Sequence, residues 1–149
     1  MAIARGAGTE IIRSIHLEDV DSTTSELIFG VQHHIYTVLS IIIYGKVVQA
    51  AGNVVEVSLS GYDAKEGTTN EGIVIFQQPM NVNDTFVWND KFSFNGHEPT
   101  DFAGPMDSIV KQDAIADQGS SVAQKLVIAT ANAADGFEVC CTFIDQNNS

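Results

Sequence analysis

Apolar and polar residues alternate near the end of the chain with the period of two that β-strands require. In residues 137–145 one face collects Phe137, Val139, Cys141 and Phe143, and the other collects Glu138, Cys140, Thr142 and Ile144. Residues 124–130 are a second predicted strand, and residues 131–136 between them are a turn. The pattern predicts a closing β-hairpin whose Phe137 face lies in the core.

Short strands divided by polar turn clusters are predicted along the rest of the chain. Residues 34–44 are rich in β-branched and aromatic side chains, which predicts a long strand buried on both faces. Two strands flank Asn89-Asp90, which is typical of a two-residue hairpin turn. Residues 106–116 fit either one short helix or an irregular excursion. The other predicted strands are 9–17, 26–31, 54–59 and 72–78, and the predicted loops are 18–25, 61–72 and 96–104.

This spacing of strands predicts an all-β fold, an antiparallel β-sandwich of jelly-roll type with at most one short helix. The 149 residues suit one domain over residues 9–149. Residues 1–8 are small and uncharged apart from Arg5, which predicts a flexible N-terminal arm that a partner would order. We expect no secretory signal, because residues 1–8 are short and lack an apolar core region, and the apolar run at 36–44 is too short to span a bilayer.

The net charge of the chain argues against two classes of partner. Nineteen acidic and seven basic residues give a formal charge of −12, spread along the chain. Such a charge disfavours nucleic acid and anionic membrane surfaces, so we expect neither as a partner. The only cysteines are Cys140 and Cys141, and neighbours on a strand point to opposite faces. We therefore expect no disulfide between them, and synthesis in a reducing compartment.

Residues with reactive side chains do not form a recognisable catalytic or metal-binding pattern. His33 and His34 are adjacent, so they diverge on a strand and suit packing better than a shared metal, and His16 and His97 are isolated. In residues 19–26, side chains whose oxygen atoms could bind calcium stand at alternate positions. The segment lacks the glycine turn and the distal glutamate of a calcium loop. No Gly-x-Ser-x-Gly motif is present, and a carboxylate pair for glycoside hydrolysis is left open because no two acids stand out. We expect no cofactor and no enzymatic activity.

The order of the segments resembles the small β-sandwich virion proteins of tailed bacteriophages, which decorate or cement capsids or build tail accessories. The resemblance covers about residues 9–146: a long buried strand at 36–44, an alternating strand at 54–59, a pair around Asn89-Asp90, and the closing segment Lys-Leu-Val-Ile-Ala, turn, Phe-Glu-Val-Cys-Cys-Thr-Phe-Ile-Asp. It implies a non-enzymatic homo-oligomer, often a trimer, bound to the major coat protein or other virion proteins. The protein would then be made in the host cytoplasm and act in the virion.

Three functional hypotheses follow. The first is a capsid decoration protein that bridges coat subunits, with an arm that adds to the sheet edge of a neighbouring subunit; the arm residues are Ala2, Ile3, Ala4, Arg5, Gly6, Ala7 and Gly8. The second is a carbohydrate-binding or adhesion module on a tail or cell surface, with Trp88, Tyr62 and Asp63 as contacts, although the aromatic residues around Trp88 favour core packing. The third is a metal-dependent β-barrel enzyme that uses His33 or His34.

Overall fold

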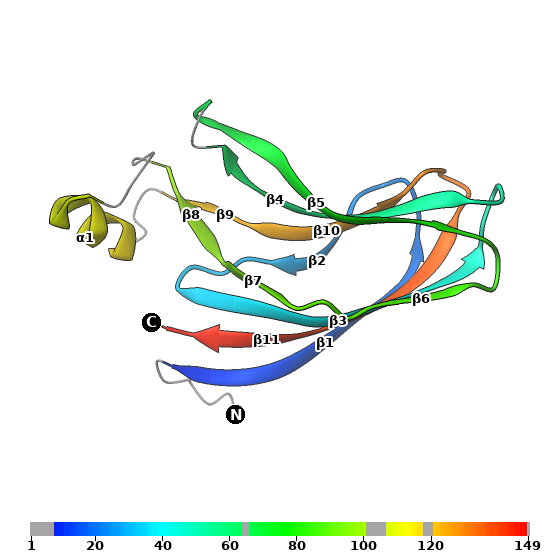
Figure 1. Ribbon diagram of the computed structural model, residues 1–149, viewed down its shortest axis with the longest axis horizontal. Coiled ribbons are helices and arrows are strands. Elements are labelled where there is room, and N and C mark those ends of the chain that lie inside the picture. The colour runs from blue at the N-terminus through cyan, green and yellow to red at the C-terminus, as the bar shows by residue number, and fades with distance from the viewer. Residues whose placement is uncertain (1–7, 64–65, 101–106, 118–120, 149) are drawn as a thin grey trace.

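The computed structural model describes residues 8–63, 66–100, 107–117 and 121–148, and it consists of two antiparallel β-sheets packed face to face (Figure 1). This confirms the predicted antiparallel β-sandwich. The strands are β1 (Thr9–Val20), β2 (Ser25–Phe29), β3 (His34–Val47), β4 (Asn53–Asp63), β5 (Thr68–Met80), β6 (Thr85–Trp88), β7 (Phe92–Asn95), β8 (His97–Pro99), β9 (Ser121–Ala123), β10 (Lys125–Thr130) and β11 (Gly136–Asn147), with one helix, α1 (Ile109–Asp117).

The first sheet, called sheet A, has the strand order β1-β11-β3-β6, with β7 also paired to β3. The second, called sheet B, has the order β2-β10-β4-β5. A small third ladder joins β8 to β9. Strands that are neighbours in a sheet are mostly distant in sequence, as in Greek-key and jelly-roll folds. The two long strands β3 and β11 form the centre of sheet A and pair over almost their full length.

The core lies between the sheets, where alternate residues of every long strand point inward. From β11 these are Phe137, Val139, Cys141 and Phe143, all buried, as the sequence pattern predicts. The facing residues of sheet B include Val55, Val57, Leu126 and Ile128, none of which has exposed surface. Burial of these aliphatic and aromatic side chains is the main source of stability in such a fold.

A continuous line of aromatic rings runs along one side of this core. Tyr36 stacks on Phe94 with ring centroids 5.4 Å apart, and Phe94 leads through Phe92 to Trp88. Trp88 in turn stacks on Phe76 of sheet B, at 5.6 Å. The predicted packing role of Trp88 is therefore confirmed, because its ring lies between the two sheets.

The predicted closing hairpin is wrong. β10 pairs with β2 and β4 in sheet B, whereas β11 pairs with β1 and β3 in sheet A. Residues 131–135 thus carry the chain from one sheet to the other. A hairpin and a crossing between two sheets both bury one face of each strand. Both therefore show the same period-two alternation in the sequence.

The predicted hairpin around Asn89-Asp90 is also wrong. β6 pairs with residues 41–44 of β3, and β7 pairs with residues 35–38 of the same strand. The two short strands therefore continue one another along the edge of β3, with Asn89-Asp90 as an interruption between them.

Further predictions differ from the structure, among them the loop at 96–104, in which His97–Pro99 form β8. Sheet B covers only one face of β3, so Ile35 and Ile42 are exposed and the strand is not buried on both faces. Residues 61–72 are largely an extension of the β4–β5 ladder, with Tyr62 opposite Thr69, and not a loop. The first strand continues to Val20, beyond the predicted end at residue 17.

The ambiguous segment at 106–116 contains the short helix α1, which Figure 1 shows beyond one end of the two sheets. Residues 1–7 of the predicted arm lie outside the described residues. Gly8 is described, and its amide donates to the carbonyl oxygen of Asn147. No helix in the described parts of the chain is long and apolar enough to cross a membrane.

Candidate interaction surfaces

The outer side of sheet A carries a broad area without acidic side chains, which we call the neutral face. The register places its residues in three rows that cross the strands. Successive rows are two residues apart along β1 and β11, and all of their residues point away from the core. On β3 the step from Thr37 to Ser40 is three residues, because the register shifts there. The rows are Ile12–Ile144–Thr37–Ser93, Ser14–Thr142–Ser40 and His16–Cys140–Ile42–Val87.

Apolar groups on the neutral face are accessible to a partner. The exposed fraction is 72% for Ile12, 52% for Val87 and 40% for Ile42. These are β-branched side chains on the rigid central and edge strands of the sheet, so a partner would lose little side-chain entropy in covering them.

Four of the five hydroxyl groups on the neutral face form two hydrogen-bonded pairs, and Ser40 is the fifth. Ser14 Oγ lies 3.1 Å from Thr142 Oγ1, and Thr37 Oγ1 lies 2.9 Å from Ser93 Oγ. Each pair joins adjacent strands. Because these hydroxyls already hydrogen-bond within the sheet, covering them costs less than burying unpaired polar groups.

Charged residues border the neutral face at both ends. Glu10 occupies the next row beyond Ile12, and Glu138 the next row beyond Cys140. Glu138 is accompanied by Lys46, whose Nζ lies 3.8 Å from its Oε1. The chain has nineteen acidic residues. The neutral face, with three rows and no carboxylate, is therefore less acidic than the chain as a whole.

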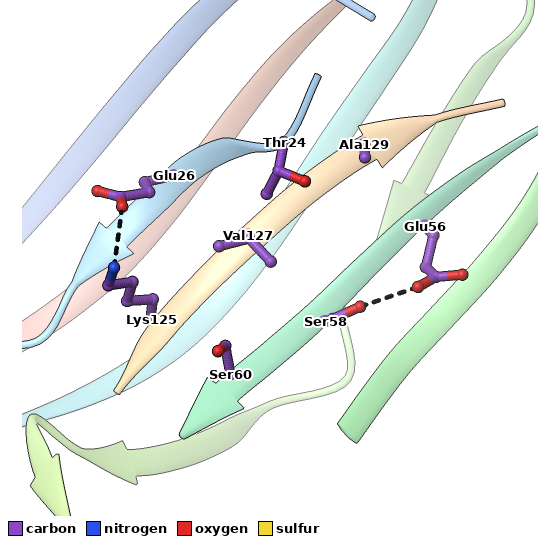
Figure 2. Close-up of a pocket in the computed structure, with 8 residues that line it drawn as sticks. All are labelled: Thr24, Glu26, Glu56, Ser58, Ser60, Lys125, Val127 and Ala129. Atoms are coloured by element: carbon purple, nitrogen blue, oxygen red, sulfur yellow. Dashed lines mark hydrogen bonds and ion pairs between the residues drawn. The ribbon is translucent and has the colours of Figure 1, made fainter. Parts of the chain in front are cut away.

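The outer side of sheet B has a different character, because it is hollowed into a polar groove of about 420 Å³. Figure 2 shows short side chains along its floor, from Thr24, Val127, Ala129, Ser58 and Ser60, with longer ones at its margins. At one margin Lys125 Nζ lies 3.4 Å from Glu26 Oε1.

At the opposite margin of the groove, Glu56 accepts hydrogen bonds from Gln77 Nε2 at 2.6 Å and Ser58 Oγ at 3.1 Å. Both carboxylates at the groove are thus held by neighbours. None of the eight lining residues is a histidine or cysteine. The groove can exchange hydrogen bonds with a neutral hydroxylated ligand, but it presents no activated nucleophile.

A third candidate is the apolar cleft of about 250 Å³ at the side of the sandwich between β1 and β2. Its wall holds the buried carboxylate of Asp145, which lies 3.2 Å from Arg13 Nε and 2.6 Å from His34 Nδ1. An ionised carboxylate only accepts, so Nδ1 of His34 carries a proton. This cluster links β1, β3 and β11, and its contacts are those of a structural ion pair.

The histidines do not converge on a metal site. Nδ1 of His34 lies 2.6 Å from Asp145 Oδ1. Nδ1 of His97 lies 2.8 Å from Ser121 Oγ. Burial, followed by the charge of His33, lowers the pKa of His97 below its ordinary value. Within the ranges that the structure describes, no three His, Cys, Asp or Glu side chains gather as metal ligands would.

The two cysteines occupy opposite faces of β11, as predicted. Both are free, with Cys140 on the neutral face and Cys141 buried. Burial, and to a smaller extent the neighbouring Cys140, raises the pKa of the Cys141 thiol to about 12. Cys141 is therefore a core residue rather than a nucleophile.

In residues 19–26, which lack the full pattern of a calcium loop, residues 21–24 form a turn between β1 and β2. Asp21 Oδ1 accepts a hydrogen bond from the amide of Thr23 at 2.8 Å, which is the contact of an Asx turn. Asp19 is the last exposed residue before Val20 and adopts a positive φ of 55°. The backbone uses this segment to leave sheet A for sheet B.

The contacts suggested for carbohydrate binding are separated. Trp88 belongs to the inter-sheet aromatic line, while Tyr62 and Asp63 lie at the far end of β4. Sequence reasoning did not detect the neutral face or the groove. The signal for the neutral face is present in the sequence as uncharged alternate positions, but it appears only when β1, β11, β3 and β6 are placed side by side.

No protein-family model and no curated protein sequence matches the chain. Among solved structures, the chain is similar to one described as "Bacillus endospore appendages form a novel family of disulfide-linked pili", with 12% identity, a TM-score of 0.44, and coverage of 100% of this chain and 97% of that one. It is also similar to the infectious bursal disease virus Gx strain structure (7% identity, TM-score 0.43, 96% of this chain and 33% of that one). The VP2 subviral particle of that virus gives 8% identity, a TM-score of 0.40, and coverage of 97% and 34%. The chain thus spans about a third of the viral chains.

Proposed function

We propose that the protein is a non-enzymatic structural subunit of a virion, and specifically a decoration protein that bridges subunits of a tailed-phage coat. Its action is mechanical: each copy adds interface area to the shell, and symmetry repeats that small gain many times. The partners are other copies of the chain and the major coat protein, and no cofactor takes part.

The observation that carries the proposal is the edge position of β1 in sheet A. This strand is 12 residues long, and it ends the strand order β1-β11-β3-β6. Long edge strands bind further strands through backbone hydrogen bonds. The edge is bordered by the exposed Ile12, and the arm Ala2 to Gly8, whose one charged residue is Arg5, precedes it in the sequence. We propose that the arm adds to such an edge on a neighbouring subunit.

The test is co-sedimentation of the protein with expanded empty shells of a tailed-phage coat protein from the same source. We expect binding that is weakened at least tenfold by deletion of residues 2–8, with an unchanged circular dichroism spectrum. Replacement of residues 2–8 by glycine and serine in equal number controls for length and should weaken binding equally. A monomer that binds no shell would overturn the proposal.

A carbohydrate-binding module is the second candidate, and the polar groove of sheet B is the observation that favours it. Its hydroxyl and carboxylate groups, from Ser58, Ser60 and Glu56, match the hydrogen-bonding needs of a sugar. A glycan array tests it: binding that Ser58→Phe removes by filling the groove would support this function, and the absence of binding to any glycan would exclude it for the glycans tested.

A further inference from the structure

We infer that the outer side of sheet B binds a linear, uncharged glycan that lies along β10 and β4, and that the carboxylate of Glu56 selects it. The inference rests on the carbohydrate-binding function proposed above as the second candidate, and it names the class of sugar and the residue that recognises it. It is carried by the length of the hollowed surface, by the bends in the sheet beneath it, and by the fixed orientation of the Glu56 carboxylate.

The groove on sheet B continues into a second hollow along the same strands. This hollow holds about 320 Å³ and shares Glu56 and Ala129 with the groove of about 420 Å³. Because Glu56 on β4 lies directly opposite Ala129 on β10, the two hollows meet at one cross-strand pair. The strand from Lys125, in the groove, to Thr130, in the second hollow, spans about 17 Å. The two hollows together, which we call the trough, therefore suit a long and narrow ligand.

The sheet beneath the trough carries a bulge on each side. Ser58 and Val127 face each other across the regular β4–β10 ladder. Beside this pair the register shifts in both neighbouring ladders, after Leu126 in the β10–β2 ladder and after Val57 in the β4–β5 ladder. Such β-bulges bend the bulged strand, increase its twist, and are common beside active sites. Ser58, Val127 and Ala129 are half-buried although they point outward, so the backbone contributes to the hollow as well as the short side chains.

The carboxylate of Glu56 is held in one orientation where the two hollows meet (Figure 2). Its Oε1 accepts a hydrogen bond from Ser58 Oγ at 3.1 Å, and its Oε2 accepts one from Gln77 Nε2 at 2.6 Å. An ionised carboxylate has about four acceptor positions, so each oxygen can accept one more hydrogen bond. Two adjacent acceptors match two neighbouring hydroxyl groups of a sugar ring, and hydrogen bonds to a charged acceptor are the stronger kind.

Other classes of ligand fit the trough less well. A peptide that binds a sheet adds to an edge strand or inserts apolar anchors. The strands β10 and β4 are interior strands of sheet B, and the apolar residues that line the trough are valines and alanines. A nucleic acid or an anionic sugar would meet the carboxylates of Glu26 and Glu56, and Lys125 Nζ already lies 3.4 Å from Glu26 Oε1. A neutral glycan brings several hydroxyl groups, each of which can donate and accept.

A glycan array followed by isothermal titration calorimetry of the full chain tests the inference. The array carries neutral and anionic glycans, with each neutral sugar present as a monosaccharide and as a linear tetrasaccharide. We expect binding to a neutral tetrasaccharide with a dissociation constant at least tenfold lower than that of its monosaccharide, because the longer ligand contacts both hollows. We expect no preference for anionic glycans.

Two variants and a matched control locate the bound sugar. Glu56→Gln removes the charged acceptor and should raise the dissociation constant of the tetrasaccharide at least tenfold. Glu10→Gln makes the same change on β1 of sheet A and should alter it less than twofold. Val54 lines the second hollow alone of the two, so Val54→Trp should weaken the tetrasaccharide to within threefold of the monosaccharide. An unchanged far-ultraviolet circular dichroism spectrum shows that each variant is folded.

The results separate this inference from the functions proposed above. Equal affinity for a tetrasaccharide and its monosaccharide would overturn the extended trough and leave carbohydrate binding in place. Binding that survives Glu56→Gln, or that prefers anionic glycans, would also overturn the inference. Absence of binding to every glycan would overturn the inference and the carbohydrate-binding function together, whereas the decoration function depends on shell binding, which is measured separately.

Discussion

The buried carboxylate of Asp135 binds the side chain of Asn53, with Nδ2 at 3.0 Å from Oδ1 and 3.2 Å from Oδ2. The same Oδ1 accepts the amide of Gln49 at 2.7 Å. Asp135 ends the β10–β11 connection, Gln49 lies in the β3–β4 connection, and Asn53 is the first residue of β4. This contact fixes the point at which the chain crosses from sheet B to sheet A.

Asp135→Ala should destabilise the fold by about 3 kcal/mol, because it leaves two donors without their acceptor in a site where the carboxylate is only 5% exposed. Urea unfolding should show a lower midpoint with an unchanged slope. Asp84→Ala is the control: its carboxylate accepts the amide of Asn81 at 2.8 Å but is exposed, so the loss should be below about 1 kcal/mol. Equal losses of stability in the two variants would contradict the stronger contribution of the buried Asp135 carboxylate.

Trp88→Ala should cost about 3 kcal/mol, because it removes the ring that stacks on Phe76 between the sheets. Trp88→Phe should retain more than half of that stability. Thermal unfolding followed by far-ultraviolet circular dichroism measures both. A fully stable Trp88→Ala variant would mean that the ring does not hold the sheets together.

One thiol of the two should react in the native state. Cys140 lies on the neutral face, while Cys141 is buried with its pKa raised to about 12. A colorimetric thiol assay should count one reactive group in buffer and two in strong denaturant. Cys140→Ser should remove the native reaction and Cys141→Ser should not. Rapid native reaction of both thiols would show that the core opens.

Stability should fall as pH decreases below about 6.5 because of His97. Its lowered pKa means that the unfolded chain takes up the proton first, so protonation favours unfolding between the ordinary and the lowered pKa and has no further effect below both. Urea unfolding from pH 7.5 to 5.5 measures this. His97→Asn should flatten the dependence, whereas the exposed His16→Asn should not. A dependence unchanged in His97→Asn would assign it to other groups.

The sequence predicted which face of each strand is buried better than it predicted which strands pair with one another. The alternation around Phe137 and Cys141 requires a strand with one buried face, and that much is visible in the residues. Nothing in the alternation distinguishes a hairpin from a crossing between sheets. That choice depends on distant contacts such as the one between Asp135 and Asn53, which join segments 82 residues apart.

The β6–β7 error has a similar origin. Asn89-Asp90 suits a tight turn, but Phe86, Trp88, Phe92 and Phe94 all need the same core. Because β6 and β7 both pair with β3, all four rings lie on the inner side of sheet A. A hairpin at Asn89-Asp90 would pair β6 with β7, and a further strand would be needed to cover the same rings. Of the candidate surfaces, the neutral face could not be predicted because its rows combine residues from five strands.

Two glycines close one end of the sandwich by direct backbone contact. A Cβ at Gly30 would lie 2.1 Å from the carbonyl oxygen of Gly96, and one at Gly96 would lie 2.0 Å from that of Val31. Their amides also donate, to Gln124 and His34 respectively. In evolutionary terms these two positions should stay invariant in distant homologues whose surfaces have diverged completely. A search for relatives of this chain would therefore gain more from the spacing of Gly30 and Gly96 than from any exposed residue.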